Sequence, residues 1–170
     1  MTSKQPTIHE VTGDILLSKA QAIAHGVAPH DHFDSGLARS LREQWPSMHK
    51  DFRHHCHISN PGPGEAWMWG GTDGKRIVCL LTQEPCSKNG HGHPGKATVE
   101  NVNHALRRLR LLAEKEGFSS LALPRLATGV GGLSWDQVRP LVDNHLGQLG
   151  IPVFVYTQYQ KGTPAEEIGI

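Results

Sequence analysis

The stretch that decides the fold is residues 119–135, SSLALPRLATGVGGLSW. Its apolar start, residues 119–123, predicts a buried strand, and Ser134 with Gln137 forms a capping-box pattern that predicts the start of a helix. Between them, glycines at 129, 131 and 132 leave backbone amides free of neighbouring side chains. Amides held ahead of a helix suit a phosphate or diphosphate, although an ordinary Gly-rich turn shows the same pattern.

On either side of this stretch the chain alternates apolar runs with helical patterns, which is typical of α/β folds. The predicted strands are residues 7–11, 22–27, 66–69, 76–82, 119–123 and 152–156. The predicted helices are residues 35–45, residues 98–117 from a Thr98 N-cap to a Gly117 C-cap, and residues 134–147, where Pro140 should kink the helix or shift its start. Residues 77–81 are continuously apolar, so we expect a central strand covered on both faces.

Length and charge narrow the class of protein. The 170 residues suit one domain, and 17 basic against 16 acidic side chains argue against stable nucleic-acid binding or a polybasic membrane patch. Three cysteines without a CxxC pair favour a reducing compartment, and we find neither an apolar run of roughly 20 residues nor a signal-peptide core. We therefore expect a cytoplasmic monomer without membrane attachment, with a flexible N-terminus at 1–6, one domain at 7–160 and a flexible tail at 161–170.

Two further junctions place polar residues at the ends of predicted strands. Gly13 and Asp14 follow the first strand, and a polar loop at 25–36 follows the second, where Asp34 and Ser35 suit the cap of the next helix. Either feature alone fits a simple turn or cap. Together with the loop at 128–133, they all lie at the carboxyl ends of strands, where α/β sheets bind ligands.

These motifs together resemble a known family. Residues 11–15, VTGDI, resemble the opening Val-x-Gly-Asp-Ile/Leu of macrodomains, and residues 123–135, LPRLATGVGGLSW, resemble the Pro-Arg-Ile-Gly-x-Gly segment and following Trp of their terminal ADP-ribose protein glycohydrolase-like branch. Residues 24–26, 35–38 and 153–157 match further motifs in the same order. The chain is thus similar to an ADP-ribose-binding module, which implies a three-layer α/β/α fold with a mixed central sheet.

The resemblance implies a role for each matching residue. Asp14 would accept the adenine amino group while the Ile15 backbone supports the ring, and Tyr156 or Tyr159 would border the adenine, although packing within an edge strand explains either tyrosine as well. The loop containing His25, Ser35 and Gly36 would wrap the distal ribose and one phosphate. The diphosphate would rest on the backbone of Thr128, Gly129, Val130, Gly131, Gly132 and Leu133.

The sequence departs from the branch at its two catalytic positions. Gln83 stands where the branch has a lysine and Gly131 where it has an aspartate, so the Schiff-base route would need Lys88 or Lys96 from the insertion at 84–96. The alternative is hydrolysis by water, with Asp34, His32 or His30 as general base and a substrate phosphate helping to orient the water. A helix cap at Asp34 and solvated histidines are the simpler interpretation of the same residues.

The resemblance implies ADP-ribose, or an ADP-ribosylated substrate, as the partner. The leading hypothesis is a hydrolase that releases ADP-ribose from an O-linked, ester-type adduct or a nucleobase adduct, so that an ADP-ribosylated nucleic acid stays open as a substrate. The alternatives are a catalytically inactive ADP-ribose reader and a module for another nucleotide. We expect neither a metal nor an organic cofactor, because the histidine clusters at 30–32, 54–57 and 91–93 lack a recognised zinc spacing.

Overall fold

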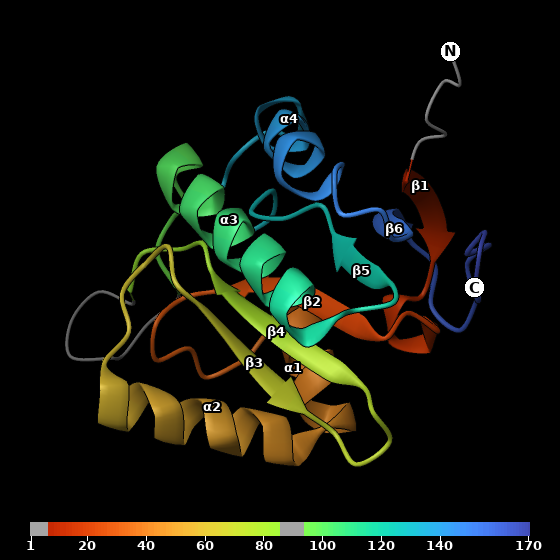
Figure 1. The fold of residues 1–170 in the computed structure, drawn as a ribbon. Coiled ribbons are helices and arrows are strands. Elements are labelled where there is room, and N and C mark those ends of the chain that lie inside the picture. The colour runs from red at the N-terminus through yellow and green to blue at the C-terminus, as the bar shows by residue number, and fades with distance from the viewer. Residues whose placement is uncertain (1–6, 86–93) are drawn as a thin grey trace.

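The computed structural model describes residues 7–85 and 94–170 and contains a six-stranded sheet (Figure 1). The strands are β1 (Ile8–Gly13), β2 (Ala22–Val27), β3 (Ala66–Gly70), β4 (Arg76–Leu81), β5 (Leu121–Pro124) and β6 (Val153–Tyr159). Their order across the sheet is β1-β6-β5-β2-β4-β3.

The sheet is mixed, as the resemblance implied. Neighbouring strands from β1 to β4 pair in parallel, whereas β3 pairs antiparallel to β4 at the edge. The carboxyl ends of five strands therefore meet at one edge of the sheet. The turns that follow β1, β2, β4 and β5 all lie at that edge, which is where the predicted ligand-binding motifs fall.

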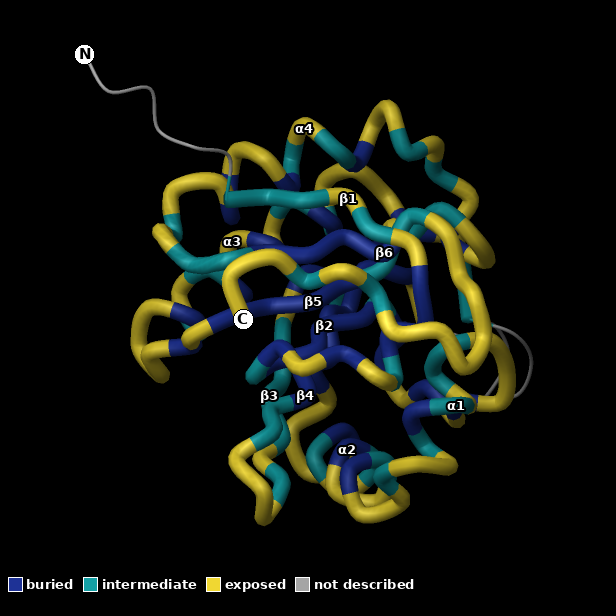
Figure 2. Tube along the Cα trace, turned by 90° about the vertical axis from the view of Figure 1, so that its right-hand side faces the viewer, coloured by how far each residue is buried: buried dark blue, intermediate teal, exposed yellow. Residues whose placement is uncertain are grey.

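Helices cover both faces of the sheet and complete three layers, which confirms the predicted fold class. In Figure 1, α3 (Val99–Glu116) and α4 (Trp135–Leu146) lie above the sheet, and α1 (Gly36–Gln44) and α2 (Pro46–Ser59) lie below it. Alternate residues of β4 lie in two separate hydrophobic cores. Val78 and Leu80 pack toward α3 and α4. Ile77, Cys79 and Leu81 pack toward α1 and α2. Figure 2 shows the buried strands between the two helical layers.

Two helices show where local sequence signals succeeded and failed. The side chain of Thr98 accepts a hydrogen bond from the Asn101 amide (3.0 Å) and Gly117 ends α3 in a left-handed conformation, as predicted. The sequence predicts a first helix that ends at residue 45, before Pro46, and gives no second helix where α2 lies. Pro46 also begins that helix, because proline at a first helical position loses no helical hydrogen bond and its φ already fits.

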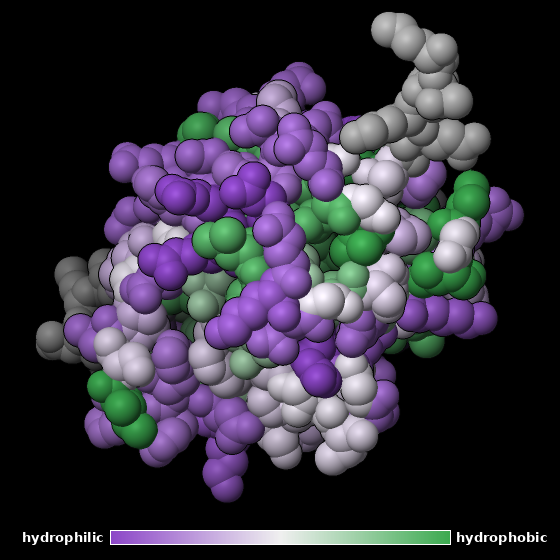
Figure 3. Space-filling model, viewed as in Figure 1, coloured by the Kyte–Doolittle hydropathy of each residue, from purple (hydrophilic) through white to green (hydrophobic). Residues whose placement is uncertain are grey.

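Both helical layers leave a largely polar exterior. Figure 3 shows a mostly hydrophilic surface on the face seen in Figure 1, broken by apolar patches. Within the described ranges, the chain forms no helix with the length and apolar character needed to span a membrane.

The C-terminal residues make contacts with the rest of the domain. Residues 1–6 lie outside the described residues, whereas residues 161–170 fold back onto β1 and β6. The Asp14 amide donates to the carbonyl of Thr163 (2.8 Å), and Glu167 accepts hydrogen bonds from Ser18 (2.6 Å) and Tyr156 (2.9 Å). These contacts join residues 161–170, whose composition predicts a flexible tail, to the turn after β1 and to β6.

Candidate functional site

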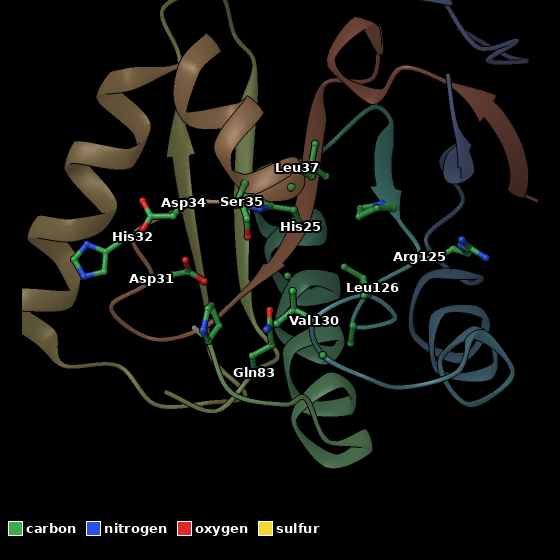
Figure 4. A pocket seen from close by; sticks show the side chains of 18 residues that line it. His25, Asp31, His32, Asp34, Ser35, Leu37, Gln83, Arg125, Leu126 and Val130 are labelled. Atoms are coloured by element: carbon green, nitrogen blue, oxygen red, sulfur yellow. The ribbon is translucent and has the colours of Figure 1, made fainter. Parts of the chain in front are cut away.

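A cavity of about 580 Å³ opens at the carboxyl edge of the sheet (Figure 4), a volume typical of small-molecule sites. Three parts of the chain surround it: the loop after β2 with the start of α1, the turn after β4, and the loop after β5. The lining residues are His25, Gly26, Asp31, His32, Asp34, Ser35, Gly36, Leu37, Ala38, Gln83, Pro94, Pro124, Arg125, Leu126, Ala127, Gly129, Val130 and Gly131.

The cavity brings together eight of the fourteen predicted site residues. They are His25, His32, Asp34, Ser35, Gly36, Gly129, Val130 and Gly131. The other six do not line it: Asp14, Ile15, Thr128, Gly132, Leu133 and Tyr156. Of these, Asp14, Ile15 and Tyr156 form the predicted adenine end, and all three are nearly buried, with exposed fractions of 3 to 6%.

The loop after β5 presents free amides to the cavity. The Gly132 amide donates to the Gly129 carbonyl and the Leu133 amide to the Ala127 carbonyl, both at 3.0 Å, so the loop itself uses these two donors. Among the described residues, the amides of residues 128–131 meet no acceptor. A run of unpaired amides next to a cavity suits an anion, and these amides are the ones left for a diphosphate.

The same loop has no room for a side chain at position 131. A Cβ added to Gly131 would lie 2.7 Å from the carbonyl oxygen and 2.9 Å from the Cα of Ala127, whose φ is +62°. Backbone atoms cannot move aside as a flexible side chain can, so the aspartate of the resembling branch does not fit this conformation. A Cβ on Gly129, by contrast, would meet nothing within 4 Å.

Asp31 fixes the loop after β2, a role that the sequence analysis did not assign. Its carboxylate accepts hydrogen bonds from the amides of Ala28 (3.0 Å) and Phe33 (2.9 Å). Phe33 is fully buried at a φ of +56°, a conformation that a phenylalanine adopts only when its surroundings enforce it. An aspartate two residues before a buried aromatic side chain is the signal for such a turn.

Two of the three candidate bases, Asp34 and His32, lie at one end of the cavity, and Arg125 lies at the other (Figure 4). The third candidate, His30, does not line the cavity. The Asp34 carboxylate is 78% exposed and pairs with Arg42 (3.1 Å). The guanidinium of Arg53 lies 2.9 Å from Nδ1 of His32. An arginine thus contacts each of the side chains of Asp34 and His32, and both side chains remain exposed to water at the mouth of the cavity.

His25 is the most perturbed titratable group of the cavity. Its ring is 1% exposed, Nε2 lies 3.3 Å from the Cys79 sulfur, and Nδ1 has no partner among the described residues. Burial lowers the pKa of His25 to about 3, and burial raises the pKa of the Cys79 thiol well above its usual range. The buried thiol keeps its proton, and we expect it to donate to Nε2, which would leave the ring hydrogen on Nδ1.

The described part of the cavity wall contains no lysine. Gln83 is 7% exposed and its amide nitrogen donates to the Gly95 carbonyl (3.1 Å), so it holds the neighbouring turn in place. Lys96 is exposed and does not line the cavity, and Lys88 lies outside the described residues. The described cavity wall therefore supplies no amine for a Schiff base, whose formation requires a lysine. Lys96 lies beside the same loop, where its Cδ would be 4.0 Å from a Cβ added to Gly132.

The predicted histidine clusters can be traced only in part. Among residues 7–85 and 94–170, no three or more His, Cys, Asp or Glu side chains gather as they would around a metal ion. The cluster at 91–93 lies outside these ranges.

Comparison with known proteins now identifies the family. A family model described as Macro domain matches residues 30–142, which include most of the cavity wall. The chain belongs to the macro domain family. This assignment agrees with the sheet order, the loop after β5 and the resemblance stated above.

Two relatives and one solved structure are among the most similar proteins. A "DNA ADP-ribosyl transferase-DNA ADP-ribosyl glycohydrolase fusion protein" of Thermosipho africanus is 27% identical over 91% of this chain. The human "ADP-ribose glycohydrolase OARD1" is 28% identical over 86% of this chain and 89% of its own length. The structure of "Thermosipho africanus DarTG in complex with ADP-ribose" superposes with a TM-score of 0.77 at 24% identity, over 92% of this chain and 42% of that one. The present chain also spans 42% of the length of the fusion relative.

Proposed function

We propose that this macro domain binds ADP-ribose in the cavity and hydrolyses an ADP-ribosyl bond. The observation that carries the proposal is the run of unpaired amides at 128–131 in a loop whose residues Gly129, Val130 and Gly131 line a cavity of about 580 Å³. The names of the relatives support it, since one is an ADP-ribose glycohydrolase and another carries a DNA ADP-ribosyl glycohydrolase part.

The ligand would lie across the cavity from one polar end to the other. Its diphosphate would accept hydrogen bonds from the amides of residues 128–131. The distal ribose would lie under the loop that Asp31 holds, close to Ser35 and Gly36. Its anomeric carbon would then face the end of the cavity that carries Asp34 and His32.

Without a lysine in the described wall, water is the nucleophile that fits best. Its oxygen would form a bond to the anomeric carbon, and Asp34 would take the released proton. The bond from that carbon to the leaving oxygen or nitrogen would break with its electron pair, and the leaving group would be protonated by solvent. Arg42 would keep the Asp34 carboxylate in place, and His32 is the second candidate base.

The leaving group would depart past a basic rim. Arg42, Arg53 and the histidines at 30 and 32 lie around this end of the cavity, with the Arg53 guanidinium 3.2 Å from the His30 carbonyl. Positive side chains at this place favour an anionic leaving group, such as a carboxylate from an ester or a nucleobase within a nucleic acid strand. We propose both adduct types as the substrate class and test them side by side.

The proposal is tested with Asp34→Asn, which keeps the shape of the side chain and removes the base. We expect release of ADP-ribose from an ester-linked protein or a nucleobase-linked oligonucleotide to fall by at least about 100-fold, with ADP-ribose affinity within about threefold of the wild type. Asp136→Asn, on the exposed start of α4, is the matched control and should leave both values unchanged.

Three other outcomes would contradict parts of the proposal. If the wild type releases nothing above background but binds ADP-ribose, the domain is a reader. If Asp34→Asn retains full turnover, another residue is the base, with His32→Gln as the next variant. Equal affinity for ATP would show that the cavity does not select for the distal ribose.

We also infer that the chain acts as a monomer in the cytoplasm. In the described part of the chain Cys56 and Cys79 are buried free thiols, which supports a reducing compartment. Light scattering at micromolar concentration tests the oligomeric state, and a dimer mass would contradict it.

A further inference from the structure

The adenine end of the proposed site is covered by the chain's own C-terminal segment. The Asp14 carboxylate, to which the family resemblance assigns the adenine amino group, is 5% exposed. One of its oxygens accepts a hydrogen bond from the Leu16 amide (3.0 Å), and the other accepts one from the Gly162 amide (2.9 Å). We call residues 160–167 the C-terminal strap.

The strap lies directly on the backbone of the β1 turn. A Cβ added to Gly13 would lie 2.8 Å from the Ala165 nitrogen and 2.9 Å from the Thr163 carbonyl oxygen. The amides of Asp14 and Gln160 donate across this contact, to Thr163 (2.8 Å) and Gly13 (3.0 Å) respectively. Only a glycine at position 13 permits so close an approach.

Glu167 fastens the far end of the strap. Its carboxylate accepts hydrogen bonds from the Ser18 hydroxyl (2.6 Å), the Lys19 amide (2.8 Å) and the Tyr156 hydroxyl (2.9 Å). Burial, and then the carboxylate of Glu167, raise the pKa of Tyr156, so its hydroxyl keeps the proton that it donates. Hydrogen bonds to a charged group are the strong ones, and three of them converge on this single side chain.

The strap lies beyond one end of the open cavity. The cavity reaches Pro124 and Arg125 at the end of β5, and in the sheet register Pro124 lies beside Tyr156 of β6, which lies beside Val11 of β1. Figure 1 shows the C-terminal segment against β1 and β6. A ligand that extends from the cavity past Pro124 toward Asp14 therefore meets the strap.

We propose that the C-terminal strap is the determinant of purine access, and that Glu167 sets how readily adenine reaches Asp14. The inference rests on the proposed function, and it takes Asp14 as the adenine acceptor that the family resemblance implies. The strap covers the Asp14 carboxylate, and the Gly162 amide donates to one of its oxygens, so adenine reaches this carboxylate only when the strap moves away. A ligand without a base, such as ribose 5-phosphate, fills the open cavity and leaves the strap in place.

Calorimetry on the full chain tests this with Glu167→Gln, matched by Glu166→Gln at the exposed neighbouring residue. We expect Glu167→Gln to bind ADP-ribose about tenfold more tightly than the wild type, the effect of weakening charged hydrogen bonds that hold the strap. Ribose 5-phosphate affinity should stay within about twofold in both variants, and Glu166→Gln should match the wild type throughout. Unchanged or weaker ADP-ribose binding by Glu167→Gln would overturn the strap proposal.

Hydrogen exchange of the wild-type chain gives a second, independent readout. Saturating ADP-ribose should speed exchange of the Asp14 and Gly162 amides, whereas ribose 5-phosphate should not. Protection of both amides by ADP-ribose would show that adenine binds with the strap in place and would overturn the proposal. If neither ligand binds any variant, the proposed function itself fails and this inference fails with it.

Discussion

Acid should destabilise this protein through histidines whose pKa is lowered by burial, and the fully buried His25 lets the size of one contribution be worked out. His25 is 1% exposed, and burial lowers its pKa from 6.5 to about 3. Below pH 6.5 the unfolded chain binds a proton at this ring and the folded chain does not. The titration of His25 therefore lowers the free energy of unfolding as the pH falls from 6.5 toward 3. Above pH 6.5 it has almost no effect on stability.

The linkage gives a magnitude for a defined pH change. Between about pH 7.5 and pH 5, this one group should lower the free energy of unfolding by roughly 2 kcal/mol, because each pKa unit corresponds to about 1.4 kcal/mol. His25→Asn removes the titration. We expect the variant to start less stable at neutral pH but to lose about 2 kcal/mol less than the wild type on acidification.

Urea unfolding followed by circular dichroism at the two pH values measures both numbers. His57→Asn, on the exposed side of α2, is the control and should follow the wild-type pH dependence. Equal losses for the wild type and His25→Asn would refute the reasoning, since they would show that the folded chain protonates His25 as easily as the unfolded chain does.

Further predictions concern the β5 loop and the partner of His25. Gly131→Ala should lower Tm by roughly 2–12 °C in a thermal melt, because the clash with the Ala127 backbone costs about 1–3 kcal/mol. Gly129→Ala is the control and should shift Tm by less than about 2 °C. Equal shifts for the two variants would contradict the loop geometry. Cys79→Ala should move the ring ¹⁵N shifts of His25 from the Nδ1–H tautomer toward a mixture; unchanged shifts would show that the thiol does not set the tautomer.

The order of elements and the layers of the fold could be predicted from local patterns. Continuous apolar runs such as residues 77–81 identified the central strands, and the Thr98 and Gly117 caps gave the ends of α3. The missed α2 shows the limit of such signals. Pro46 follows the end of one helix and starts the next. Only the packing of Phe52 and Cys56 in the core between the sheet and the layer of α1 and α2 shows that the second helix forms.

The parts of the site formed by a local backbone motif could be predicted from the sequence. The parts formed by contacts between distant residues could not. The Gly-rich sequence at 129–132 identified the loop after β5. Which amides of this loop stay free depends on the hydrogen bonds that the loop makes to its own carbonyls, and the sequence does not show these. The covering of Asp14 could not be foreseen, because Gly162 and Glu167 are distant in sequence and lie in a polar segment typical of a loose end.

The most direct test of the account is a titration of ¹⁵N-labelled protein with ADP-ribose, followed at the backbone amides of the β5 loop. The account predicts large shift changes at residues 128–131, whose amides are free, and much smaller ones at Gly132 and Leu133, whose amides already donate within the loop. Shift changes confined to other parts of the chain, or no changes at all, would contradict the claim that these amides hold the diphosphate.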